Sequence, residues 1–249
     1  MKICDRIYIV GSGYSGFSIS NEYDCTVYLV DCGIVESRRQ LILIDAGMGT
    51  DTERILDNIR HEGFDPEDIR AVLLTHGHGD HSGGAYELKT ATGAEIFALS
   101  PTDAYIKAGD VQAISLDGAI RTGMFSDDYR YQACPVTKLS DNQTLHIGDL
   151  TFTVLRTEGH CIGHAAYLME LNGKKIVFSG DSLFAQGKIS IQAIWDCNLQ
   201  AYMETCKFLD ALHIDVLLPA HGPFALNEGY RHIKAAMDRI TDLAVPDNM

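Results

Sequence analysis

The feature that most restricts the fold is a dense group of potential metal ligands directly after an apolar segment. Residues 71–75 read AVLLT and predict a buried strand, and the run HGHGDH at residues 76–81 follows without a break. Imidazole and carboxylate groups suit zinc, iron or manganese. The interposed glycines, Gly77 and Gly79, let the backbone turn tightly. The fold must therefore open the end of this strand onto a site that can hold metal ions.

Three further ligand candidates follow the same pattern. His160 comes just after the segment TFTVL, Asp181 after KIVFS and His221 after VLLP. In open sheets covered by helices, binding sites gather outside the carboxyl ends of the strands. Any one of these residues alone is more typical of a turn or a polar contact, but the four strand ends together predict a metal centre.

Composition and net charge limit the kinds of molecule that the protein is expected to bind. The chain has 249 residues, of which 46% are hydrophobic and 22% charged, which is typical of a globular protein. No apolar run is long enough to span a membrane. The net charge of −14 repels phosphate backbones, so we expect a small-molecule substrate and no nucleic-acid or membrane partner. The oligomeric state stays open, a homo-oligomer included.

The seven cysteines are scattered, odd in number and never spaced as C-x-x-C. They predict free thiols in a reducing compartment. The N-terminus, MKICDRIYIV, lacks the features of a secretory signal. We therefore expect a cytoplasmic protein.

Apolar runs alternate with amphipathic stretches, which predicts an α/β protein. The predicted strands are residues 7–10, 26–30, 41–44, 71–75, 95–98, 143–147, 151–155, 165–170, 175–179 and 215–218. The predicted helices are residues 52–61, 84–92, 101–108, 199–212 and 228–243, the last two capped by Asn198 and Asn227. Residues 110–135 fit neither pattern and predict an inserted loop, a candidate substrate lid, within a single domain over 1–249.

At this point the chain resembles a known family, the metallo-beta-lactamase superfamily, over nearly its whole length. The resemblance rests on a complete H-x-H-x-D-H motif, followed in the family's order by the three later ligands: His76, His78, Asp80, His81, His160, Asp181 and His221. It implies a four-layer αβ/βα sandwich, in which two facing mixed β-sheets carry outer helices and the metals lie along one edge.

The resemblance also implies a site with two divalent ions, zinc first, with iron or manganese as alternatives. The first ion takes His76, His78 and His160, the second takes Asp80, His81 and His221, and Asp181 bridges both. Asp80 orients a metal-bridging hydroxide and accepts its proton. Asp45 matches an acid that supports the histidine loop from behind, and His164 is expected to support the ligands or to pack rather than to bind metal.

The implied activity is hydrolysis of a small ester, lactone, thioester or phosphodiester. The segment GHCIGHAAY with SGDSLF is similar to the glyoxalase-II-like subgroup, but we expect its C-terminal glutathione-binding region to be lacking. Asp181 stands where true zinc β-lactamases carry Cys or Ser, so antibiotic hydrolysis is not expected. The alternative is a mononuclear iron oxidoreductase of the persulfide-dioxygenase type.

Two loops are candidates for contact with substrate. The run GSGYSG at residues 11–16 has the form of a dinucleotide fingerprint, but the helix that such a site needs is missing after it. A loop between two antiparallel strands is favoured there, with Tyr14 and Phe17 able to touch substrate. Tyr129 in the insertion and Trp195 after the bridging acid are further candidates.

Overall fold

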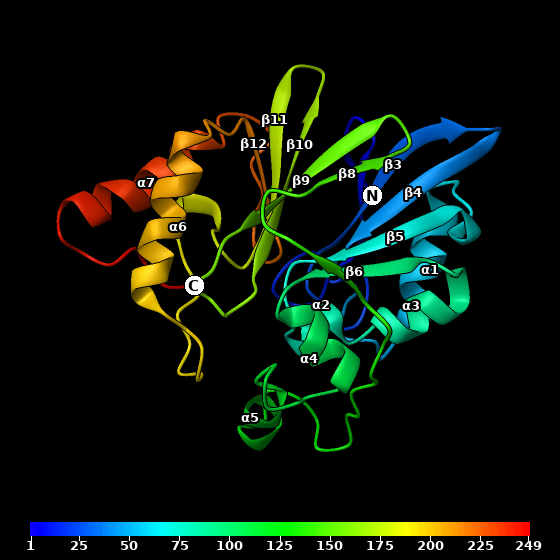
Figure 1. Ribbon diagram of the computed structural model, residues 1–249, viewed down its shortest axis with the longest axis horizontal. Helices are drawn as coiled ribbons and strands as arrows, with labels where there is room; N and C mark the ends of the chain where they lie inside the picture. Colours follow the sequence, from blue (N-terminus) through cyan, green and yellow to red (C-terminus); the bar gives the residue numbers. More distant parts are fainter. The chain divides into compact units, whose positions relative to one another are not determined.

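The computed structural model describes residues 1–249 and divides into two compact units (Figure 1). The first unit comprises residues 1–139 with 147–149, and the second comprises residues 140–146 with 150–249. The single domain over 1–249 stays a prediction. No helix is long and apolar enough to cross a membrane.

The first unit is built on a seven-stranded sheet whose strands follow one another in chain order. The first four strands pair antiparallel and the later ones parallel. The strands are β1 (Lys2–Cys4), β2 (Ile7–Gly11), β3 (Val27–Val35), β4 (Arg38–Ile44), β5 (Ile69–Leu74), β6 (Glu95–Leu99) and β7 (Thr137–Leu139). In β5 the last four residues are all buried, as expected for a strand covered on both faces.

Helices connect the parallel strands of the first unit, because a parallel crossover needs a dozen or more residues. The connections are α1 (Thr52–His61), α3 (Ala85–Thr92) and α4 (Thr102–Ala108), with the short helices η1 (Pro66–Asp68), α2 (Gly79–Ser82) and α5 (Leu116–Arg121). Helix α1 buries Ile55, Leu56 and Ile59 on one face, so its buried apolar residues follow the 3.6-residue period of a helix.

The second unit is built on a five-stranded sheet in the order β12-β11-β10-β9-β8. The strands are β8 (Thr144–Ile147), β9 (Leu150–Arg156), β10 (Ala165–Leu171), β11 (Lys174–Gly180) and β12 (Val216–Pro219). Only β11 and β12 pair parallel, and the chain between them contains the short helix η2 (Ala185–Gly187) and α6 (Leu199–Ala211). Strand β9 alternates buried Leu150, Phe152 and Val154 with less buried threonines, as its sequence predicts.

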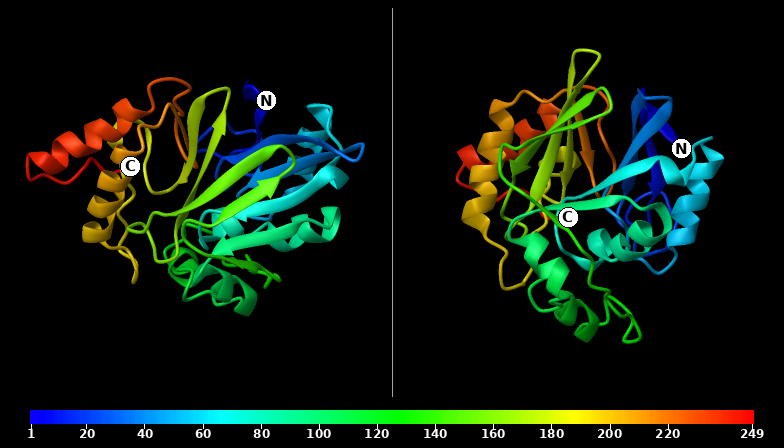
Figure 2. Two further views of the ribbon diagram at one scale, coloured as in Figure 1. Left: turned by 45° about the horizontal axis from the view of Figure 1, so that its top comes forward. Right: turned by 45° about the vertical axis from the view of Figure 1, so that its right-hand side comes forward.

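Helices α6 and α7 (Tyr230–Thr241) lie beside one another along the second sheet (Figure 2). Their apolar faces join the sheet in one core cluster. That cluster includes Val177 and Leu217 from the strands, Leu209 from α6 and Ile233 from α7. Burial of these side chains holds the loops that follow β9, β11 and β12 in place.

All ten predicted strands and all five predicted helices are present, with ends shifted by up to a few residues. Asn198 caps α6 as predicted, since its side chain accepts a hydrogen bond from the Ala201 amide. The predicted cap Asn227 is wrong: α7 begins at Tyr230, and the Asn227 side chain accepts from Lys174 Nζ instead.

The prediction of a loop over residues 110–135 needs correction. This segment contains helix α5, and it packs Ile114, Leu116 and Phe125 against Met48 in a small apolar cluster. A helix of six residues is too short to show a clear apolar period in sequence. The insertion is therefore a folded part of the first unit.

Candidate metal centre

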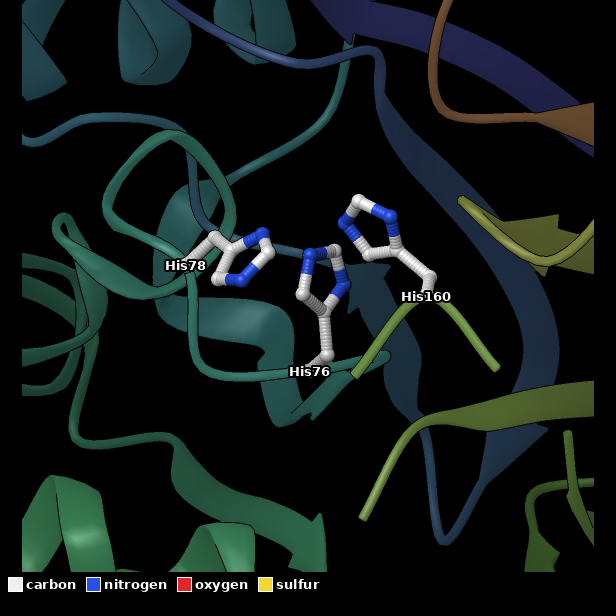
Figure 3. Close-up of side chains that lie close together, drawn as sticks. All are labelled: His76, His78 and His160. Carbon is white, nitrogen blue, oxygen red and sulfur yellow. The ribbon is translucent and has the colours of Figure 1, made fainter. Parts of the chain in front are cut away.

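The four candidate ligands of the histidine loop, residues 76–81, gather at the carboxyl end of β5 in the first unit. The His76 and His78 rings meet edge to face with centroids 4.5 Å apart (Figure 3), and the His81 ring lies 4.0 Å from that of His76. His76 and His81 are fully buried. Imidazoles packed this closely away from water are suited to share a metal ion.

Gly77 is required by this packing. A Cβ added there would lie 2.7 Å from Ile114 Cγ2, a branched and buried side chain. The insertion and the histidine loop therefore approach each other at a distance that only glycine permits.

Asp45 lies behind the histidine loop and forms hydrogen bonds with it. Its buried carboxylate accepts from the Thr75 amide at 2.7 Å, from Thr75 Oγ1 and from His81 Nδ1 at 2.9 Å. Because Nδ1 donates to Asp45, Nε2 is the atom that His81 offers to a metal, and it lies 3.3 Å from Asp80 Oδ2. The contact between Thr75, the residue before His76, and Asp45 was not predicted from the sequence.

Cys25 lies beside this support. Ligand-type atoms of Cys25, Asp45 and His81 are within 4.8 Å of one another. Burial raises the pKa of the Cys25 thiol well above its ordinary value, so the thiol stays protonated at neutral pH.

Two tyrosines of the insertion form hydrogen bonds with the first unit, one to Met48 and the other, through Ser82, to the histidine loop. Tyr129 donates to the Met48 carbonyl at 2.8 Å, and the Tyr131 hydroxyl lies 2.9 Å from Ser82 Oγ, which itself donates to the Gly77 carbonyl. Burial raises the pKa of both phenols, so both hydroxyls keep their protons. Tyr131 and Ser82 were missed because nothing in the local sequence links them.

In the second unit, Asp181 lies between two histidines at the strand ends. Its Oδ2 is 3.5 Å from His160 Nε2, and its Oδ1 is 3.6 Å from His221 Nε2. Each carboxylate oxygen thus faces a different imidazole nitrogen. This arrangement suits a carboxylate shared between two ions.

Hydrogen bonds fix the orientation of the histidines around Asp181. His160 Nδ1 donates to the Ser190 carbonyl at 2.9 Å, so Nε2 is the nitrogen that could bind a metal. His164 is buried and accepts from the Asp181 amide through Nε2 at 3.0 Å, while its Nδ1 lies 2.9 Å from Thr157 Oγ1. Both His164 nitrogens are thus engaged by the protein, which agrees with a supporting role.

A buried acid also holds the His160 loop. Asp196 accepts from the Ile162 amide at 2.9 Å, and burial raises the pKa of its carboxyl. Sequence reasoning missed Asp196, because it lies more than thirty residues from the loop that it holds.

The predicted substrate residues are mostly exposed. Tyr14 is 76% exposed and Phe17 40%, on a loop between the antiparallel strands β2 and β3, as predicted in place of a dinucleotide site. Trp195 is 59% exposed, whereas Tyr129 points its hydroxyl inward to Met48. Contact of any of the four with substrate stays a prediction.

The donor set fits divalent metal ions. Clusters of histidine and aspartate able to bind a metal are present, and the support behind His81 and His160 presents Nε2 in each case. Neutral imidazole backed by a carboxylate or carbonyl acceptor is the usual arrangement around protein-bound zinc.

Comparison with known proteins also indicates a family of metal-dependent proteins. The model of the metallo-beta-lactamase superfamily matches residues 25–221. A hydroxyacylglutathione hydrolase from Pseudomonas entomophila is 34% identical over 119 residues, which cover 48% of this chain and 35% of that protein. A hydroxyacylglutathione hydrolase, GloC, from Haemophilus influenzae is 26% identical over 65% of this chain and 70% of that protein.

The chain thus spans about a third of the length of the Pseudomonas relative. Among solved structures, a subclass B3 metallo-beta-lactamase of Bradyrhizobium japonicum aligns over 98% of this chain and 91% of its own, with a TM-score of 0.71 and 24% identity. This likeness confirms the predicted αβ sandwich fold, with its two mixed sheets and accompanying helices.

Proposed function

Because the chain belongs to the metallo-beta-lactamase superfamily, we propose that it is a metal-dependent hydrolase whose substrate is a small thioester. A small ester, lactone or phosphodiester is the alternative substrate. One observation carries the proposal: Asp181 divides its two carboxylate oxygens between His160 and His221, as a ligand shared by two ions requires.

The thioester is placed first because of the relatives. Several curated relatives carry the name hydroxyacylglutathione hydrolase, and their substrates are therefore acyl thioesters of glutathione. The structural likeness to B3 metallo-beta-lactamases supports the fold and no substrate. The proposal is thus an acyl thioesterase, with an acyl-glutathione as the first compound to assay.

We assign the ligands as the family motif orders them. His76, His78 and His160, the three side chains labelled in Figure 3, would hold the first ion, and Asp80, His81 and His221 would hold the second, with Asp181 available to both. Zinc is the first candidate, and iron and manganese are the others, since imidazole and carboxylate accept all three.

Divalent ions held by these residues would supply a water that ionises near neutral pH and would polarise the scissile oxygen. We assign Asp80 the task of orienting that water and accepting its proton. Its side chain is 18% exposed, compared with 6% for Asp181, so it is the acid of the pair that substrate and solvent can reach. Asp45 and the Ser190 carbonyl hold His81 and His160 in the required tautomers.

The alternative, a mononuclear iron oxidoreductase, predicts a different metal content. The second ligand set is present in full, which favours two ions. We would measure metal identity and stoichiometry by plasma mass spectrometry on protein purified without added metal. About two ions per chain support the hydrolase, whereas a single iron with oxygen consumption on a persulfide supports the alternative.

Hydrolysis is tested on an acyl-glutathione thioester, a lactone and a phosphodiester. We expect Asp181→Asn to lower kcat/KM at least a hundredfold, because a neutral amide is a weak ligand. His146→Ala, which removes an exposed histidine on β8, is the matched control and should retain full activity. Full activity in an Asp80→Ala variant with both ions bound would refute the role given to Asp80.

A further inference from the structure

Tyr202 is a fully buried tyrosine on α6 that lies against the His160 loop. A Cβ added to Gly159 would lie 2.6 Å from Tyr202 Cα and Cγ, so the helix backbone and the loop are in direct contact. The Asn198 amide also donates to the Gly159 carbonyl at 2.8 Å. The start of α6 is thereby fixed to the residue that precedes a proposed ligand.

The Tyr202 hydroxyl connects two of the loops that carry ligands. It donates to the Asp181 carbonyl at 2.5 Å and accepts from the Ser190 amide at 3.1 Å. The Ser190 carbonyl in turn accepts from His160 Nδ1 at 2.9 Å. One phenol therefore joins the main chain of Asp181 to Ser190, the residue whose carbonyl orients His160.

The Tyr202 hydroxyl can make both hydrogen bonds at the same time. A phenol has one proton to donate and lone pairs to accept with, and both are used here. Phenylalanine at this position would keep the ring contact with Gly159 and lose both bonds.

We propose that Tyr202 is a positioning residue, which sets the spacing of His160 and Asp181 through its hydroxyl and thereby the affinity of the centre for metal. This inference rests on the proposed function, because it requires His160 and Asp181 to be ligands. Partners behind the ligands of protein metal sites commonly change metal affinity by about 10–100-fold when they are removed.

The test is Tyr202→Phe in the full chain. Zinc affinity of the metal-free protein is measured by competition with a chromophoric chelator, and the visible spectrum is recorded after cobalt(II) loading. We expect zinc to bind about 10–100-fold more weakly than in the wild type and the cobalt bands to shift. Melting of the metal-free variant, measured in parallel, reports any loss of stability separately.

Cys206→Ala is the matched control. Cys206 lies one turn further along α6, is buried in the same core cluster, and burial raises its thiol pKa to about 12. This variant should melt earlier and bind zinc with wild-type affinity. Equal loss of zinc affinity in both variants would mean that packing of α6 is the cause, and would overturn the inference.

Asn248→Ala provides a second variant with little risk to folding. The exposed Asn248 side chain accepts from the Ile191 amide at 2.7 Å and donates to its carbonyl, next to Ser190. If Tyr202→Phe does not fold, unchanged zinc affinity in Asn248→Ala overturns the inference, and a weakened affinity supports it.

Unchanged zinc affinity and an unchanged cobalt spectrum in a folded Tyr202→Phe protein overturn the inference alone. A wild-type protein that binds no divalent ion overturns the proposed function first, and the inference with it. The two failures are therefore distinguished by the wild-type measurement.

Discussion

At the scale of single residues, the proposed ligands depend on buried acceptors behind them, and Asp45 is the clearest case. Asp45→Asn replaces one carboxylate oxygen by an amide that cannot accept from both Thr75 and His81. We expect zinc affinity to fall about 10–100-fold. Chelator competition measures this, with Asp57→Asn on the exposed side of α1 as the control. Wild-type affinity in Asp45→Asn would contradict the supporting role.

The strand ends that carry the proposed ligands could be predicted from the sequence, because an apolar run precedes each of them. His160, Asp181 and His221 all come just after runs that form β9, β11 and β12. Their supports could not be predicted in this way. Ser190 is thirty residues from His160, and it accepts the hydrogen bond through its main-chain carbonyl. Any residue type has that carbonyl, so the identity of residue 190 does not predict the contact. Contacts made by main-chain atoms across the fold are not visible in a local pattern.

At the scale of elements, the prediction succeeded where periodicity was strong. Helix α1 begins and ends at the predicted residues, because its three buried apolar side chains mark one clear face. Strands β1 and β7 were missed, since three residues are too few to show alternation. Helix α5 was missed for the same reason, and with it the fact that the insertion is folded onto the histidine loop.

The hydrogen bonds between the insertion and the histidine loop predict that Ser82→Ala lowers the stability more than Tyr131→Phe. Ser82 is buried and donates to the Gly77 carbonyl, so Ser82→Ala leaves a buried acceptor without its donor. We expect a loss of about 1–3 kcal/mol in the free energy of unfolding. Tyr131→Phe removes one neutral hydrogen bond to Ser82 and should cost about 0.5–1.5 kcal/mol.

Urea unfolding of the metal-free proteins measures both losses. Thr122→Ala, which removes an exposed hydroxyl at the end of α5, serves as the control and should change stability by less than about 0.5 kcal/mol. A larger loss in Tyr131→Phe than in Ser82→Ala would show that the hydroxyl of Ser82 is not what holds the loop.

At the scale of the whole molecule, the proposed function divides the ligands between the two units. Of the proposed ligands, His76, His78, Asp80 and His81 belong to the first unit, and His160, Asp181 and His221 belong to the second. An ion held by such ligands would have no comparable site in the unfolded chain. Metal binding is then linked to folding by mass action.

Removal of the ions should therefore lower the melting temperature. At a free metal concentration of about one hundred times Kd, one ion stabilises the folded state by about 2.7 kcal/mol. For a chain of this length that corresponds to about 5–10 °C. Calorimetry with and without a chelator measures the shift, and zinc added back should restore it. His146→Ala should behave as the wild type, whereas Asp181→Asn, having lost the shared ligand, should show a smaller shift. Equal melting temperatures with and without chelator would show that the two units do not need metal to hold their native structure.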